Sequence, residues 1–350
     1  MGSEPISHSF NCFDPPADGQ TKEATMDSTG KTATASGAMD STLYYKAVGS
    51  IAIYFATVIS ALVVCITRTR FSASNAIYIL IAVSSLLTTW YYILSWFKKE
   101  YEAHGSNLDR FILESDLFVQ AYAIVTNTLP KWWWSSQLLI LTGTALTCWS
   151  VEGQSLRLET TTLNQQNKRS SPQQPTKSWT PTWWFVLLGF FGSMSVGGPL
   201  FLAQLDPTKK TRPHARTVPL FLALLILLGE KRFLTVSLPV LYFVLALIAL
   251  VSHVMYTLPF VFSPIMQPST LYRALWFNHC QTSISADLVF NNLLAAVYMF
   301  QSSRQLGKPH VAVILTLVMP ILSVSTVLPL YLGWKERQSV VKETVKPKKA

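Results

Sequence analysis

Long apolar stretches alternate with short polar segments along the chain from about residue 46 onward. A helix of about 20 apolar residues can cross a bilayer, and seven stretches approach or exceed that length: 47–66, 75–97, 132–151, 183–204, 236–258, 282–301 and 310–333. An eighth, 217–229, has only 13 residues, so a re-entrant hairpin is the alternative there. The pattern predicts an all-α transmembrane bundle over residues 46–334, with about eight spans or else seven.

The composition agrees with this prediction. Hydrophobic residues make up 50% of the 350 positions and charged residues only 13%, whereas soluble domains carry about 25% charged residues. The net charge of +10 comes from basic residues that lie in loops and tails between the apolar stretches. Membrane topology explains this placement better than a nucleic-acid surface does. Membrane lipid is therefore an expected partner, and nucleic acid is not.

The polar segments suggest three further features. Residues 1–45 have the composition of a disordered tail, and 335–350 form a basic tail. Residues 152–182, which contain "NQQNKRSSPQQPTK", are expected to form a flexible loop. Between Asn107, a plausible N-cap, and Pro130, residues 107–129 predict a helix at the membrane interface.

The distribution of basic residues gives an orientation. With eight spans, most Lys and Arg fall on one side if both termini are cytosolic. The chain ends in "KPKKA", where Lys346 and Lys348 match a dilysine signal for retrieval to the endoplasmic reticulum. We therefore expect a multi-pass membrane protein of the endoplasmic reticulum with both termini in the cytosol.

One formal charge, Asp287, lies within the confidently assigned spans. An acid inside a membrane is costly and is a candidate functional residue. Helical spacing places Asn291 and Tyr298 on nearly the same face, so these residues could support a site. The alternative is a hydrogen-bonded clasp between helices, which contributes about 0.6 kcal/mol. His253, near the end of another span, could shuttle protons or simply pack.

Two further acids, Glu114 and Asp116, lie in the predicted interfacial helix. The eight-span topology places them at the cytosolic surface, close to the levels of Asp287 and His253, so we expect these residues to meet in one site. Glu152 ends a span on the opposite side and is interpreted as a boundary marker. Aromatic residues at the level of the predicted site could stabilise a cation or form an interfacial belt: Tyr91, Tyr92, Trp132, Trp133 and Trp134.

The motifs of several common enzyme classes are missing from the sequence. The sequence contains no Walker-type loop, GxSxG, HExxH or CxxC, and no two acids are adjacent. We therefore expect neither a metal nor a cofactor. A carboxyl group in an oily cavity remains protonated more readily than in water, so it could protonate an epoxide or a terminal alkene. Aromatic faces would then stabilise the cation. Such a site suits a lipophilic prenylated substrate.

The segments "ESDLFVQAY", "WWWSSQLL" and "ADLVFNN" resemble fungal membrane-bound terpene cyclases of meroterpenoid biosynthesis, of the ascochlorin, ascofuranone and macrophorin type. The resemblance covers roughly residues 45–335. It implies a metal-independent isomerase or lyase of secondary metabolism that cyclises the farnesyl chain of an aromatic or quinone-like precursor. It also implies Glu114, Asp116 and Asp287 as the acids, and other enzymes of the pathway as partners.

Two other functions fit the same residues. A sterol isomerase of the emopamil-binding kind also places acids, histidine and aromatic rings around a carbocation. A proton-coupled transporter of small molecules also needs acids inside the membrane. Transporters often carry internal repeats with broken helices in corresponding positions. We expect neither feature here, which favours an enzyme.

Overall fold

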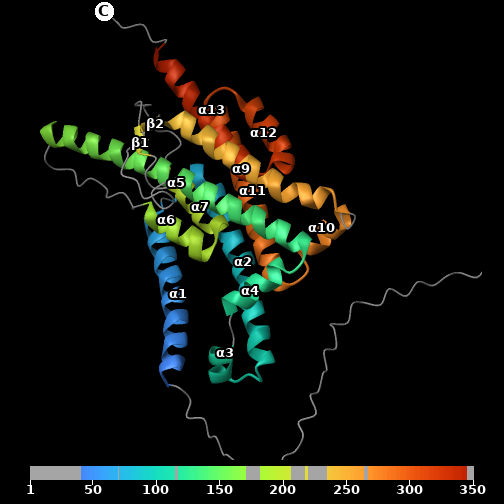
Figure 1. Cartoon of the computed structure of the whole chain (residues 1–350). Coiled ribbons are helices and arrows are strands. Elements are labelled where there is room, and N and C mark those ends of the chain that lie inside the picture. Colours follow the sequence, from blue (N-terminus) through green and yellow to red (C-terminus); the bar gives the residue numbers. More distant parts are fainter. Residues whose placement is uncertain are drawn as a thin grey trace, which may run out of the picture. The chain divides into compact units, whose positions relative to one another are not determined.

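The structure, a computed structural model, describes residues 41–69, 71–114, 117–170, 182–205, 217–219, 235–263 and 267–344. It confirms the predicted all-α membrane bundle (Figure 1). The described strands are two three-residue segments, β1 (Thr217–Pro219) and β2 (Thr235–Ser237), which pair antiparallel. Of the marginal stretch 217–229, residues 220–229 lie outside the described residues.

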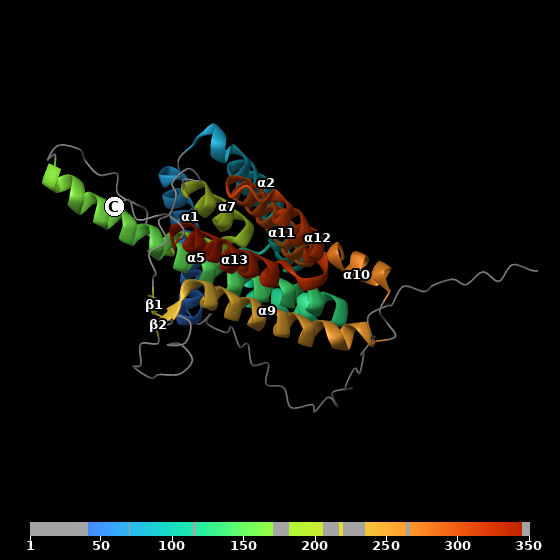
Figure 2. The same ribbon diagram turned by 90° about the horizontal axis from the view of Figure 1, so that it is seen from above.

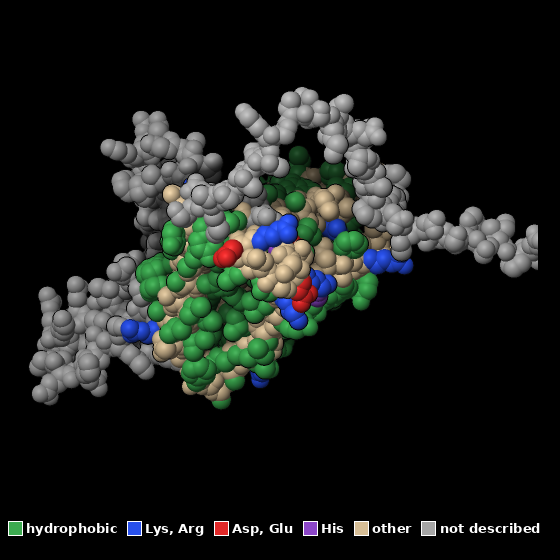
Figure 3. All heavy atoms as spheres, turned by 90° about the horizontal axis from the view of Figure 1, so that it is seen from below, with side chains coloured by type: hydrophobic (Ala, Val, Ile, Leu, Met, Phe, Trp, Pro, Cys, Tyr) green, Lys and Arg blue, Asp and Glu red, His purple; other side chains and the backbone are tan. Residues whose placement is uncertain are grey.

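Four described helices are long and apolar enough to cross a membrane. They are α1 (Ser41–Arg68), α2 (Ala76–Ala103), which follows the short η1 (Ala73–Asn75), α9 (Leu238–Val261) and α11 (His279–Gln305). Their outward positions carry apolar side chains; Ile53 on α1 and Leu247 on α9 are 70% and 59% exposed. Hydrophobic side chains also cover much of the face seen from below (Figure 3). Such surfaces fit a bilayer.

The predicted span 183–204 is a hairpin. It consists of α6 (Trp183–Leu187), the π-helical turn η2 (Leu188–Gly192) and α7 (Met194–Gln204). At its tip, Phe191 accepts a hydrogen bond from Tyr54 in the middle of α1. At its outer end, Ala203 accepts one from Asn75, where α2 begins. The segment therefore enters the bundle and returns toward the same end, because Ser193 is extended and interrupts the helix.

The predicted span 310–333 is a second hairpin, made of α12 (Pro309–Leu322) and α13 (Val324–Thr344). Ser323 separates the helices with a φ of 68°, a left-handed conformation that L-residues seldom adopt. The outer ends of the two arms are joined by a hydrogen bond from Lys308 to Gln338. Continuous hydrophobicity concealed both interruptions, since hydropathy alone does not reveal where a helix reverses.

The two hairpins share a sequence. Residues 193–203 read "SMSVGGPLFLA" and residues 323–333 read "SVSTVLPLYLG", with five of eleven positions identical. Ser193 and Ser323 occupy the same position at the two tips. The expectation that the chain lacks an internal repeat with broken helices in corresponding positions is therefore wrong. The repeat is short enough to be hidden among similar apolar segments.

The elements around the hairpins repeat as well. In each half a long helix (α2 or α9) leads through short helices to another long helix (α5 or α11) and then to a hairpin. Helix α2 packs on α7 and α11, whereas α9 packs on α13 and α5. We call α2, α7 and α11 the first unit, and α5, α9 and α13 the second unit. Figures 1 and 2 show them side by side.

The connecting segments also differ from expectation. Helix α5 (Leu129–Ser170) continues through most of the predicted flexible loop 152–182, and residues 171–181 lie outside the described residues. Polar composition suggested a loop, but no proline or glycine occurs between Gly153 and Pro172 to end the helix. The predicted interfacial helix is divided into α3 (Leu108–Glu114) and α4 (Leu117–Thr126). A short helix, α10 (Pro268–Leu275), leads into α11.

Gly197 allows the arms of the first hairpin to touch. A Cβ there would lie 2.9 Å from the Gly189 nitrogen and 3.0 Å from the Phe185 carbonyl oxygen, both backbone atoms. We expect Gly197→Ala to lower the free energy of unfolding in detergent by about 1–3 kcal/mol. Gly143→Ala is the control, because a Cβ on Gly143 meets nothing within 4 Å. Equal thermal stabilities of the two variants would contradict this packing.

Candidate functional site

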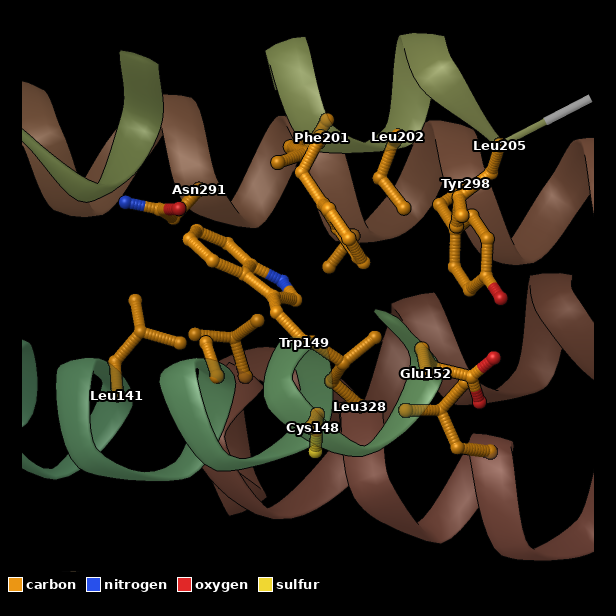
Figure 4. Close-up of a pocket in the computed structure, with 15 residues that line it drawn as sticks. Leu141, Cys148, Trp149, Glu152, Phe201, Leu202, Leu205, Asn291, Tyr298 and Leu328 are labelled. Atoms are coloured by element: carbon orange, nitrogen blue, oxygen red, sulfur yellow. The ribbon is translucent and has the colours of Figure 1, made fainter. Parts of the chain in front are cut away.

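A cavity lies between the two units, lined by residues of α5, α7, α11 and α13. Its walls are mostly apolar, with Leu141 and Ala145 from α5 facing Leu294 from α11 and Leu328 from α13. The Trp149 indole extends across the middle, near Phe201 (Figure 4), and the two ring centroids are 5.9 Å apart. The cavity therefore offers aromatic faces in an apolar setting.

One end of the cavity is polar. In Figure 4 the Glu152 carboxylate and the Tyr298 hydroxyl lie at this end, and Asn291 lies at the other. The Tyr242 hydroxyl donates to Glu152 Oε1 at 2.6 Å, and Lys335 Nζ donates to the Tyr298 oxygen at 2.9 Å. Four groups that can carry or stabilise protons thus gather at the polar end.

Lys335 remains charged in this place. Burial acts to lower its pKa, but Tyr298 and Glu152 outweigh that effect, so the pKa of Lys335 is raised. The polar end therefore holds two hydrogen-bonded pairs, Tyr242 with Glu152 and Lys335 with Tyr298. Charged groups therefore lie next to the apolar walls of the same cavity.

The cavity has a volume of about 30 Å³, measured as the space that the centre of a water molecule can reach. This is enough for about two water molecules. An occupant much larger than water requires the walls to move apart.

Asp287 lies beside the cavity lining, behind Asn291. Its Oδ1 accepts hydrogen bonds from the Ser195 backbone N–H at 2.7 Å, the Ser193 hydroxyl at 3.0 Å and Asn291 Nδ2 at 3.1 Å. Ser193 is the N-cap of α7. The carboxylate thus satisfies donors at a helix N-terminus, where negative charge is favoured. Of the predicted polar stripe, Asn291 and Tyr298 line the cavity, and Asp287 holds the tip of the first hairpin.

His253 contacts the second hairpin close to its tip. Its Nε2 is 3.0 Å from the Ile321 carbonyl oxygen, near the end of α12, and its Nδ1 is 2.8 Å from Gln137 Oε1. Gln137 Nε2 is buried and has no hydrogen-bond partner. Exchanging the amide oxygen and nitrogen of Gln137 lets that nitrogen donate to Nδ1 of a neutral imidazole, while Nε2–H donates to Ile321. His253 therefore supports a helix end and does not line the cavity.

The predicted aromatic residues lie away from the cavity. Trp133 stacks on Phe260 at 5.5 Å and donates to Thr257, and Trp134 donates to the Leu271 carbonyl. Trp132 contacts Tyr256, and Tyr92 contacts His279. The Tyr91 side chain is 64% exposed. The tryptophans pack α5 against α9 and α10.

Of the three predicted acids, the structure describes the side chain of Asp287 alone. Asp116 lies outside the described residues, as does the side chain of Glu114, so their roles stay predictions. Glu152, interpreted from the sequence as a boundary marker, is the acid that lines the cavity. The sequence did contain a signal for this site, because Cys148 and Trp149 lie one helical turn before Glu152 on the same face of α5. That face borders a cavity because the hairpins place α7 and α13 opposite it.

Comparison with known proteins assigns no activity. A family profile described as "Protein of unknown function DUF2834" matches residues 241–337, a stretch that begins in α9 and ends in α13. No curated protein matches the chain. No solved structure matches it either. Among the described residues, no group of three or more His, Cys, Asp or Glu side chains is arranged to hold a metal ion.

Asp287→Ala removes the carboxylate that accepts from three buried donors, and the Ser195 N–H loses the acceptor that it has there. We expect it to lower the free energy of unfolding by roughly 2–4 kcal/mol, measured by thermal unfolding in detergent and by the amount of protein in membranes. Asn292→Ala is the control, since Asn292 donates within α11 to the Leu288 carbonyl. A stable Asp287→Ala protein that has lost its activity would support a catalytic carboxyl instead.

Proposed function

We propose that this protein is a membrane-bound cyclase, similar to the fungal terpene cyclases of meroterpenoid biosynthesis, that acts on a lipophilic prenylated substrate. The observation that carries the proposal is the cavity, in which Glu152 and Tyr298 adjoin apolar walls and aromatic rings. The proposal moves the acid from Asp287 to the polar end of the cavity. Glu114 and Asp116 remain candidates from the resemblance.

The proposed reaction begins with the transfer of a proton to the substrate. The Tyr298 oxygen accepts from Lys335, so its own O–H can point toward a ligand. Transfer of a proton to an epoxide oxygen breaks a C–O bond, or transfer to a terminal alkene forms a C–H bond, and either leaves a carbocation. A second alkene of the chain attacks this cation and closes a ring. Loss of a proton to the Glu152 carboxylate ends the reaction, and return of that proton to the Tyr298 phenolate restores both groups, so cyclisation consumes no proton overall.

The residues that line the cavity can stabilise the carbocation intermediate of this reaction. The rings of Trp149 and Phe201 can stabilise a desolvated cation by about 2 kcal/mol each. The apolar walls leave room for few of the water molecules that would otherwise quench the cation. Both properties belong to the same cavity as the proton-carrying groups, and this coincidence supports a cyclase more than a simple lipid-binding site.

The experiment compares variants in microsomes supplied with a farnesylated phenol and with its terminal epoxide. We expect Glu152→Gln and Tyr298→Phe each to lower turnover at least about 100-fold, the usual minimum contribution of a general acid or base, with unchanged abundance. Product formation is measured by mass spectrometry after chromatography.

Glu102→Gln is the matched control, because Glu102 is a 56% exposed side chain on α2 that pairs with Lys98. Full turnover in both cavity variants would refute the assignment of the proton-carrying groups. Consumption of a sterol in place of the farnesylated compounds would favour a sterol isomerase. No chemical change in any of these substrates would remove the cyclase proposal.

A proton-coupled transporter is the second candidate, favoured by the duplicated hairpins and by a cavity between two similar units. Transporters commonly place their sites at such an interface, next to broken helices. Sealed vesicles distinguish the two functions: uptake of an unchanged compound, dependent on a pH gradient, supports transport. Appearance of an isomeric product supports the cyclase.

The hairpins also revise the proposed orientation. Because each hairpin returns toward the end at which it entered, the first helix begins at one end of the bundle and α13 finishes at the other (Figure 1). Of the 28 Lys and Arg residues, 20 occur in the sequence segments that adjoin helix ends on the side where α1 finishes, namely 68–75, 153–182, 205–237, 304–308 and 334–350. The positive-inside rule then places the C-terminal tail in the cytosol and the N-terminal tail across the membrane. A cytosolic "KPKKA" remains compatible with retrieval to the endoplasmic reticulum.

Cysteine labelling tests this orientation. Cys12 lies in the N-terminal tail, and the three described cysteines are buried. We expect a membrane-impermeant maleimide to label Ala350→Cys in intact microsomes, whose outer face is cytosolic, and to label Cys12 only after permeabilisation. Mass spectrometry identifies the labelled residue. Labelling of Cys12 in intact microsomes would restore the arrangement with both termini in the cytosol.

A further inference from the structure

The cavity lies between two units that are each joined internally. In the first unit, Asp287 of α11 binds the tip that leads into α7. In the second unit, Trp133 of α5 binds Thr257 of α9, and Glu152 of α5 binds Tyr242 of α9. These bonds lie within a unit and would persist if the units moved apart. The wall of the cavity is thus divided between two bodies.

In the described part of the chain, hydrogen bonds join α11 of the first unit to α13 of the second. Lys335 donates to Tyr298 at 2.9 Å, and Ser303 donates to the Tyr331 oxygen at 3.1 Å. Tyr298 lines the cavity at its polar end, and Ser303 lies just over one turn farther along α11. Ser303 and Tyr331 are each 0% exposed, so this contact is fully enclosed.

We propose that these two bonds are a latch, and that the cavity admits its ligand when α11 and α13 separate at the polar end. A cavity of about 30 Å³ holds about two water molecules, so any larger occupant requires such a movement. Separation there exposes the Tyr298 hydroxyl and the Lys335 ammonium to the incoming molecule. The ligand that fits is a lipophilic chain whose head carries a hydrogen-bond-accepting oxygen, which replaces Tyr298 as the partner of Lys335.

The location of the cavity as the binding site rests on the proposed function, but the movement does not depend on any reaction. Cys148 reports on it directly, because it lines the cavity and is 1% exposed. Cys65 on α1 is 0% exposed and is not among the lining residues. Opening of the latch exposes Cys148 selectively, whereas general loosening exposes both thiols.

The experiment follows alkylation of the purified, full-length protein by N-ethylmaleimide in lipid nanodiscs, with each cysteine quantified by mass spectrometry. Tyr331→Phe and Ser303→Ala each remove the same bond while keeping most of the packing. We expect either variant to raise the alkylation rate of Cys148 about fivefold, as the loss of one ordinary hydrogen bond implies, and to leave the rate of Cys65 unchanged.

Thr257→Val is the matched control, because it removes a hydrogen bond within the second unit and should leave Cys148 unchanged. An unaltered Cys148 rate in both latch variants overturns the proposal. So does a parallel rise of Cys148 and Cys65, which would show a loss of general stability. Since no substrate is present, the latch can be confirmed even if the protein proves not to be a cyclase.

Discussion

Backbone N–H and C=O groups inside a membrane must find partners within the protein, because the hydrocarbon offers none. This chain breaks two helices inside its bundle, at Ser193 and Ser323, and each break exposes such groups. Asp287 accepts from the N–H groups that open α7, and His253 lies within hydrogen-bond distance of a carbonyl near the end of α12. The polar residues that looked most catalytic in the sequence are therefore the ones that make the broken helices possible.

The internal repeat explains the positions of the residues that bind the two hairpin tips. Gln137 and Asp287 occupy similar places on α5 and α11, the two helices that precede the hairpins. Asp287 binds the hairpin tip of the other half of the sequence directly, whereas Gln137 reaches the other tip through His253. One tip has a carboxylate with three donors, and the other a neutral histidine and amide. The first unit therefore combines α2 and α7 from one half of the sequence with α11 from the other, and the second combines α9 and α13 with α5. Because each unit draws helices from both halves, the two halves are interlocked.

The helical membrane bundle depends on composition and could be predicted from the sequence. The two reversals of the chain inside it could not. Hydropathy identified the helical membrane bundle and the long helices such as α1 and α11, because about 20 apolar residues carry that information locally. It did not show that 183–204 and 310–333 turn back, since Ser193 and Ser323 are ordinary polar residues in apolar surroundings. That error placed Glu152 at a remote boundary. Asn291 and Tyr298 were found by helical periodicity, which survives any change in topology.

The requirement that backbone groups in a membrane find partners within the protein also links the architecture of the bundle to the chemistry of its cavity. A hairpin that stops inside the bundle leaves room that a full span would have filled, and here α7 and α13 border the cavity on opposite sides. The apolar arms exclude water, whereas their outer ends, at the charged side of the bundle, place Lys335 next to Tyr298. A site built this way is dry along its length and can exchange protons at one end. Carbocation chemistry and proton-coupled transport both need that combination, and what separates them is whether the occupant leaves with its bonds rearranged.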